Sequence, residues 1–154
     1  MRKREFETDR GTLRYWVSEN DEETAQLVFL PGLTADHRLF DKQVDCFAQR
    51  ARCLVWDPPS HGESRPFSLD WSFGRPCLML EQILSREGFE RPILVGQSMG
   101  WIRIPGVHKA VPRQGLRLRV RRFVSARSVV LYRDRALGVE ACEECLQKAL
   151  PVLD

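Results

Sequence analysis

The stretch Pro92–Gly100 constrains the fold most, because a short apolar run leads directly into a serine flanked by glycines. Ile93–Val95 has strand character, and Gly96–Gly100 follows it with the pattern G-x-S-x-G. In a sharp strand-to-helix turn the backbone at both glycines approaches its neighbours too closely for a side chain. Such a turn lifts the Ser98 hydroxyl out of the sheet and directs backbone N–H groups toward it. The alternative is an ordinary turn of glycine and serine.

The rest of residues 1–100 alternates between short apolar runs and amphipathic segments. One helix is expected over 36–50, with Phe40, Val44 and Phe47 on one face, and another over 76–86, with Leu80, Ile83 and Leu84 on one face. Strands are expected at 12–17, 26–30, 52–56 and 93–95. This order predicts an α/β fold with a mostly parallel sheet and crossover helices.

Length and composition are those of one globular domain. The chain has 154 residues, of which 43% are hydrophobic and 29% charged, and it contains no run of 18 apolar residues. No apolar stretch follows the basic start Met1–Glu5, so we expect a cytoplasmic protein without a membrane partner. Its five cysteines have no framework spacing, which favours reduced thiols.

The net charge of +3 conceals a change of sign along the chain. Residues 1–100 hold 13 Lys and Arg against 16 Asp and Glu, whereas residues 101–154 hold 11 against 5. The net charges are therefore −3 and +6. We divide the chain at this point into an amino-terminal part, 1–100, and a basic tail, 101–154.

Three segments together resemble the α/β-hydrolases over about residues 11–100. Leu30–Leu33 (L-P-G-L) resembles the oxyanion turn, Asp57–Ser64 (D-P-P-S-H-G-E-S) resembles the loop D-x-x-x-H-G-x-S, and Gly96–Gly100 resembles the nucleophile elbow. The resemblance implies the amino-terminal half of an α/β-hydrolase domain, a partial fold truncated after the elbow.

The resemblance also implies a chemistry. Ser98 would be the nucleophile that attacks an acyl carbon, and the backbone N–H groups of Met99 and Leu33 would form the oxyanion hole. The substrate would be a small ester- or amide-like molecule, and no cofactor or metal is expected. The acid and the base of a triad are not identified.

Four other residues could take part, and each has a simpler interpretation. In this family the loop histidine, His61, is usually structural, and Asp57 is interpreted as a loop-capping acid rather than a triad member. His37 lies after the oxyanion turn, where it either lines the pocket or is a solvated residue at a helix start. His108 follows Ser98 by only ten residues and is poorly placed to serve as its base.

The resemblance stops after Gly100. Pro105 would break the helix expected after the elbow, and the remaining 54 residues are too few for the later strands, the acid and the histidine. Arg117–Phe123 alternates charged and apolar residues, but the sequence contains no motif of a known nucleic-acid-binding module, so a nucleic-acid partner is not expected. The lone pair Cys142 and Cys145 is weak evidence for a zinc or redox site.

A shifted reading frame accounts for the tail. Codons for Trp101–Ser125 can be chosen whose one-nucleotide-shifted reading begins G-Y-V-S-Q-A-F and later contains Y-P-G, as a hydrolase helix and turn would. Such a tail would leave the strand 93–95 as an exposed apolar edge. We therefore expect a serine hydrolase of the α/β-hydrolase type that is catalytically incomplete. The alternative is a non-catalytic binding or interaction protein with a cationic tail.

Overall fold

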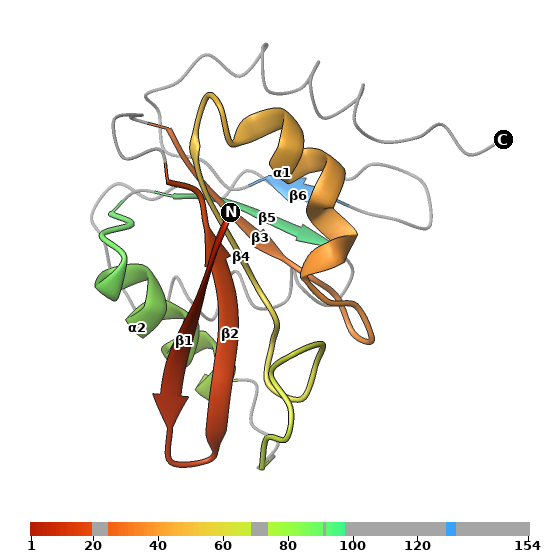
Figure 1. Ribbon diagram of the computed structural model, residues 1–154, viewed down its shortest axis with the longest axis vertical. Helices are drawn as coiled ribbons and strands as arrows, with labels where there is room; N and C mark the ends of the chain where they lie inside the picture. The colour runs from red at the N-terminus through yellow and green to blue at the C-terminus, as the bar shows by residue number, and fades with distance from the viewer. Residues whose placement is uncertain (20–24, 69–73, 91, 98–128, 132–154) are drawn as a thin grey trace, which may run out of the picture.

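A single mixed sheet organises the chain. The computed structural model describes residues 1–19, 25–68, 74–90, 92–97 and 129–131. Six strands are hydrogen-bonded in the order β1-β2-β4-β3-β5-β6 (Figure 1). Their bounds are Arg2–Thr8 (β1), Gly11–Val17 (β2), Gln26–Leu30 (β3), Arg52–Trp56 (β4), Ile93–Gln97 (β5) and Val129–Leu131 (β6). The α/β fold class predicted from the sequence is confirmed.

The centre of the sheet is parallel, as the apolar runs predicted. β3 lies between β4 and β5, with Val28 in register with Leu54 on one side and with Leu94 on the other. Four of the five residues of β3 are buried, and the same holds for β4. A strand buried on both faces needs a continuous apolar sequence, which is why these strands could be located without alternation.

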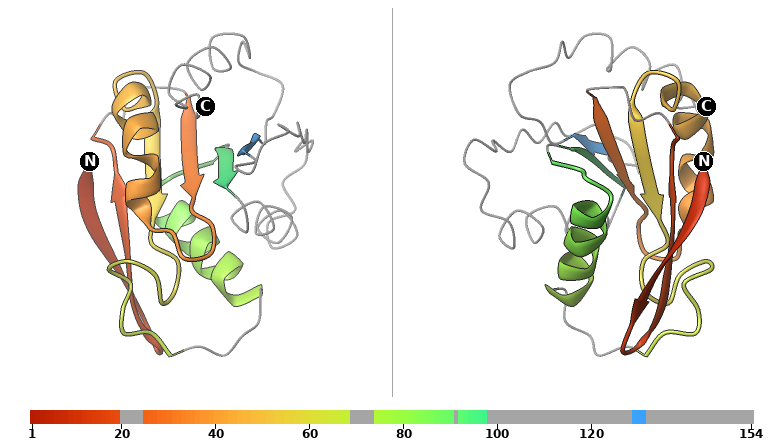
Figure 2. Two further views of the ribbon diagram at one scale, coloured as in Figure 1. Left: turned by 90° about the vertical axis from the view of Figure 1, so that its right-hand side faces the viewer. Right: turned by 60° about the vertical axis from the view of Figure 1, so that its left-hand side comes forward.

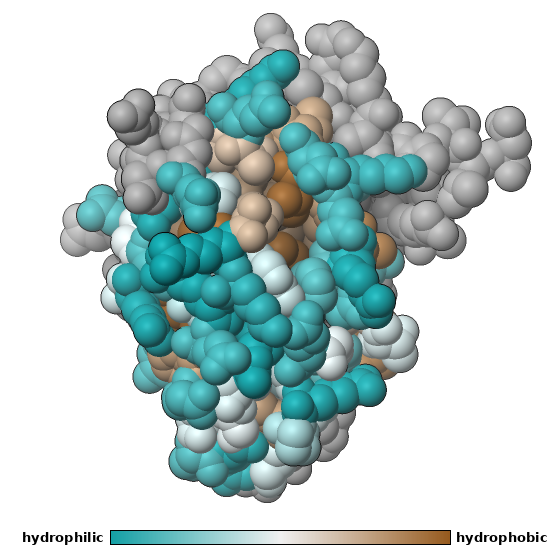
Figure 3. Space-filling view, viewed as in Figure 1, coloured by the Kyte–Doolittle hydropathy of each residue, from teal (hydrophilic) through white to brown (hydrophobic). Residues whose placement is uncertain are grey.

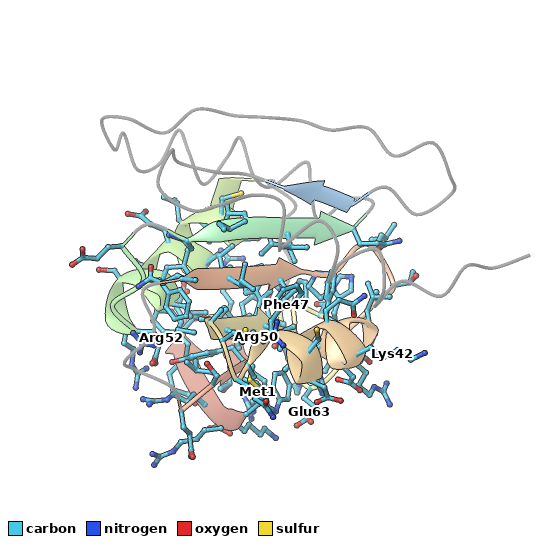
Figure 4. All side chains as sticks on the ribbon, turned by 90° about the horizontal axis from the view of Figure 1, so that it is seen from above. Met1, Lys42, Phe47, Arg50, Arg52 and Glu63 are labelled. Carbon is cyan, nitrogen blue, oxygen red and sulfur yellow. The ribbon has the colours of Figure 1, made fainter. Side chains whose placement is uncertain are left out.

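Two helical segments cover opposite faces of this sheet (Figure 2). The short 3-10 helix η1 (His37–Phe40) and α1 (Asp41–Phe47) replace the single helix expected over 36–50, and α2 spans Gly74–Arg86. On α1, Phe47 lies toward the strands while Lys42 projects away from them (Figure 4). The apolar faces predicted for both helices are buried against the sheet.

The hairpin of β1 and β2 includes a strand that the sequence did not indicate. β1 pairs antiparallel with β2 along its whole length, and all but two of its residues are exposed. Lys3 forms an ion pair with Glu63, and Arg14 pairs with Glu5 at 3.0 Å. The face seen in Figure 3 is accordingly mostly hydrophilic, with a smaller apolar area beside α1. Charged side chains protect an edge strand from pairing with other molecules. Because β1 is rich in them, its sequence lacks the apolar pattern that would predict a strand.

The edge at β5 is paired, which corrects the expectation that the strand 93–95 ends the sheet. β6 joins β5 antiparallel, with Gly96 opposite Val130. The added strand provides partners for backbone N–H and C=O groups that a free edge would expose. Part of the basic tail therefore contributes to the sheet.

The central strand β4 carries a deeply buried thiol. Cys53 is fully buried, and its Sγ lies 3.5 Å from the carbonyl oxygen of Ala51. Burial raises the pKa of this thiol to about 12, because a thiolate is poorly solvated among apolar side chains. Cys53 is accordingly a neutral thiol at neutral pH.

No helix in the described part of the chain is long and apolar enough to cross a membrane.

A buried polar pair connects β2 to the end of α2. The Tyr15 hydroxyl donates a hydrogen bond of 2.7 Å to Oε1 of Glu87, and both residues are buried. Arg4 of β1 lies 3.6 Å from the same oxygen. Burial raises the pKa of Tyr15, and the hydrogen bond to Glu87 adds to the shift, so the hydroxyl stays protonated.

We predict that Tyr15→Phe lowers the free energy of unfolding by about 1–3 kcal/mol, because it leaves the buried Glu87 carboxylate without this donor. Urea unfolding measures the change. Thr12→Val is the matched control, since it removes an exposed hydrogen bond to Glu7 and should cost less than about 0.5 kcal/mol. Combining Tyr15→Phe with Glu87→Leu should cost less than the two single changes together, and strict additivity would contradict the coupling.

Candidate active site

The strands that lead into the three motif segments end at one edge of the sheet, because these strands are parallel neighbours. The carboxyl ends of β3, β4 and β5 lie at Leu30, Trp56 and Gln97, and adjacent parallel strands end at the same edge. The predicted oxyanion turn follows β3, and the loop beginning at Asp57 follows β4. Ser98, Met99 and His108 lie outside the described residues.

The turn after β3 has an unusual backbone. The N–H of Ala35 lies 3.4 Å from the carbonyl oxygen of Gly32, which closes a tight turn with Leu33 and Thr34 at its centre. Thr34 has φ +67°, a left-handed conformation that is strained for a β-branched residue. Leu33 is 51% exposed, and no described residue accepts a hydrogen bond from its N–H. This N–H is therefore available as a donor.

Asp57 joins this turn to the loop after β4. Its carboxylate is fully buried, and Oδ1 accepts a hydrogen bond of 2.7 Å from the His37 N–H and lies 2.9 Å from His37 Nδ1. The other oxygen, Oδ2, accepts a hydrogen bond of 2.7 Å from the N–H of Glu63. These contacts are those of an acid that caps two loops, the interpretation favoured from the sequence.

His37 is the first residue of η1, but its side chain is largely buried, which corrects the interpretation as a solvated residue at a helix start. Its ring stacks on Trp16 with a centroid distance of 3.6 Å, and its side chain is 18% exposed. Trp16 is in register with Val55 of β4, so the ring is held over β2 and β4. β3 separates β4 from β5, and two strand spacings amount to roughly 10 Å. His37 is thus positioned away from the end of β5.

The loop after β4 is fixed by its own hydrogen bonds. His61 is buried, and its Nδ1 donates to the carbonyl oxygen of Pro59 at 2.8 Å. Ser64 Oγ donates to the Asp57 carbonyl oxygen and accepts from the N–H of Arg14, both at 2.8 Å. His61 and Ser64 therefore hold the loop together and attach it to β2.

Asp36, His37 and Asp57 are the one group of potential metal ligands in the part of the chain described, with their ligand atoms within 4.8 Å of one another. The atoms that would bind a metal already form hydrogen bonds or ion pairs within the protein. Asp36 pairs with Arg38, which lowers the pKa of the carboxyl group through the hydrogen bond between their side chains. Asp57 is occupied by backbone N–H groups. The arrangement is an ion-pair and hydrogen-bond cluster, and we assign no metal to it.

Sequence reasoning missed the contacts of His37. The alternation of β2 indicates that Trp16 and Tyr15 face opposite sides of the sheet, but no pattern indicates that Trp16 stacks on a histidine 21 positions later. The motif D-x-x-x-H-G-x-S located Asp57 and left its partner in another loop unidentified.

Comparison with known proteins identifies the fold family of the central segment. A family model described as alpha/beta hydrolase fold matches residues 26–100, a range that contains β3, β4, β5 and all three motif segments. No curated protein matches the chain.

Solved structures share this fold at low sequence identity. A hydrolase from Pseudomonas aeruginosa is 18% identical with a TM-score of 0.65, and the match covers 73% of this chain and 42% of that one. A mutant of the N-acyl homoserine lactonase AidH, complexed with N-hexanoyl homoserine lactone, is 20% identical with the same coverage and TM-score. A loop variant of the haloalkane dehalogenase DbeA from Bradyrhizobium elkanii is 16% identical with a TM-score of 0.64, covering 72% of this chain and 36% of its own.

The chain spans less than half the length of each of these proteins. At such low identities the TM-scores show a shared fold and no more. The family match places this fold on residues 26–100, which include the three parallel strands. The amino-terminal part of this chain therefore has a partial α/β-hydrolase fold.

Proposed function

We propose that this segment is built for acyl hydrolysis of the serine-hydrolase type, with Ser98 as nucleophile. The observation that carries the proposal is the available N–H of Leu33, which lies in a strained turn at the carboxyl edge of the sheet. β5 reaches the same edge at Gln97, and Ser98 is the next residue. A nucleophile and an oxyanion donor would then flank one reacting carbonyl group.

The chemistry follows from these two elements. The Ser98 oxygen would form a bond to the carbonyl carbon, and the ester C–O or amide C–N bond would break. The alcohol or amine would leave with the proton of the Ser98 hydroxyl, and a covalent acyl-enzyme would remain. The negative charge that develops on the carbonyl oxygen would be stabilised by the N–H groups of Leu33 and Met99. Removing one such donor typically costs about 3–4 kcal/mol of transition-state stabilisation.

A small molecule is the proposed substrate class. Among proteins of the same fold, one is a lactonase complexed with N-hexanoyl homoserine lactone and another is a haloalkane dehalogenase. Lactones are cyclic esters, so the first of these supports an ester- or amide-like substrate here.

We further propose that the chain does not turn over. Both histidines in the described residues are engaged elsewhere, His37 with Asp57 and Trp16, and His61 with the carbonyl of Pro59. An oxyanion hole without a base leaves a residual part of the rate enhancement. Slow acylation without sustained hydrolysis is the behaviour expected of such a site.

The second candidate is a non-catalytic binding or interaction protein. It is favoured by the charge of residues 101–154, which carry a net +6 beside an amino-terminal part of −3.

The division at residue 100 coincides with the end of the family match. We propose that residues 1–100 and 101–154 are distinct in origin and that the second part is read in a shifted frame. Sequencing the coding region around codons 98–102 tests this, and an intact frame there would contradict it.

We predict that a fluorophosphonate probe labels the chain slowly at Ser98, whereas p-nitrophenyl acetate is hydrolysed no faster than by Ser98→Ala. Mass spectrometry of the adduct and a steady-state absorbance assay measure the two. Without a base the Ser98 hydroxyl is a weak nucleophile that only the oxyanion donors assist, so labelling should be slow. Sustained turnover would also require a base that activates the water for deacylation.

Ser64→Ala is the matched control, because it removes a buried serine of the same edge that has a structural role. It should retain labelling. Absence of labelling in the parent chain would favour the binding protein, and turnover dependent on Ser98 would contradict the proposed incompleteness.

A further inference from the structure

We propose that Asp57 is the positioning residue of the oxyanion turn: its carboxylate holds residues 31–37 in the conformation that makes the Leu33 N–H available to a reacting carbonyl oxygen. The inference rests on the proposed function, which it deepens by assigning a role to a residue outside the reacting groups. Asp57 would act through the backbone of the turn and would not touch the substrate.

The first support is the placement of the hydrogen bonds. The turn leaves the sheet at Leu30 and next meets a fixed element at His37, the first residue of η1. At that point Asp57 Oδ1 receives the backbone N–H at 2.7 Å and lies 2.9 Å from ring Nδ1. Both ends of the turn are therefore anchored, one by β3 and the other by a carboxylate at the end of β4.

The second support is the packing around the carboxylate. Gly62 has φ +45°, and a Cβ built there would lie 2.2 Å from Asp57 Oδ2 and 2.8 Å from Asp36 Cβ. The loop after β4 thus closes directly over both acids and leaves no room for a side chain. Asp57 is held between the backbone of its own loop and the end of the turn.

The third support is the strain in the turn itself. Thr34 keeps a left-handed φ of +67°. A strained conformation of this kind persists only where the surrounding structure enforces it. The anchoring of His37 supplies that restraint, because a released turn could relax Thr34 toward negative φ.

The test uses variants that remove the anchor from either side. Asp57→Ala removes the acceptor. His37→Pro removes both donors, and proline suits the first position of a helix and the extended backbone of Asp36 before it. His37→Phe keeps the backbone N–H and a ring on Trp16, so it isolates the ring nitrogen.

We predict that Asp57→Ala and His37→Pro shift the NMR resonance of the Leu33 amide and lower the maximal rate of fluorophosphonate labelling by about 10²-fold, as loss of an oxyanion donor does. The apparent probe affinity should change little, because the donor acts on the transition state. His37→Phe should remain within about threefold of the parent, since it retains the anchoring N–H. Ser64→Ala, which loosens the same loop without touching His37, should change neither readout.

If Asp57→Ala, His37→Pro and Ser64→Ala changed the Leu33 resonance and the labelling rate equally, the proposal would be overturned. The anchor would then have no effect beyond that of any structural contact in the loop. If the parent chain is not labelled at all, the proposed function fails separately. The Leu33 amide resonance then tests the role of Asp57 alone, because its measurement does not depend on labelling. An unchanged resonance in both anchor variants would overturn the assignment, and a shift confined to them would support it.

We also predict that Thr34→Gly raises Tm by about 2–4 °C in the parent chain, because glycine adopts positive φ without strain. Differential scanning calorimetry measures it. Ala35→Gly, at a neighbouring position without positive φ, should lower Tm. In the Asp57→Ala background the gain from Thr34→Gly should shrink, because the turn is free to relax. An undiminished gain there would show that Asp57 does not enforce the strain.

Discussion

The parallel pairing of β3 between β4 and β5 is the constraint on which the rest of the structure depends. A strand with parallel neighbours on both sides must have both faces covered, and the connections to those neighbours must cross the sheet. α1 and α2 therefore lie on opposite faces, and each closes an apolar cluster against the same three strands. The same pairing brings the carboxyl ends of the three strands, at Leu30, Trp56 and Gln97, to one edge of the sheet, although these residues are 26 and 41 positions apart in the sequence.

A buried charge at that edge is stabilised by the chain itself. The Asp57 carboxylate lies beneath the surface, where an ion without partners would be strongly disfavoured. Backbone N–H groups of His37 and Glu63 supply the compensating dipoles, and the His37 ring adds a further contact. Because these donors belong to two loops, solvation of one carboxylate fixes both loops relative to β4. This is why Asp57 has the contacts of a structural acid, as its position in the loop motif indicated.

The parts of the fold that follow from burial could be predicted from the sequence. β3, β4 and β5 were located because their residues are apolar on both faces, and the faces of α1 and α2 because Phe40, Val44, Leu80 and Ile83 recur at helical spacing. β1 could not be predicted, because Arg2–Glu5 has the composition of an exposed segment and forms a strand only by pairing with β2. At the site, the motifs located Asp57 and Leu33. The contact of Asp57 with His37 and the left-handed backbone of Thr34 depend on how two loops meet. Contacts between loops produce no hydrophobic periodicity in the sequence of either loop.

The neutral thiol of Cys53 gives the central sheet a chemical reporter of its own opening. Thiolates are the nucleophiles that attack alkylating reagents, and a β4 thiol with a pKa near 12 presents almost none of that form while the strands are closed. Reaction at Cys53 then requires β4 to separate from its neighbours and expose the sulfur to water. The rate of modification at this position would measure how often the β4–β3–β5 core opens.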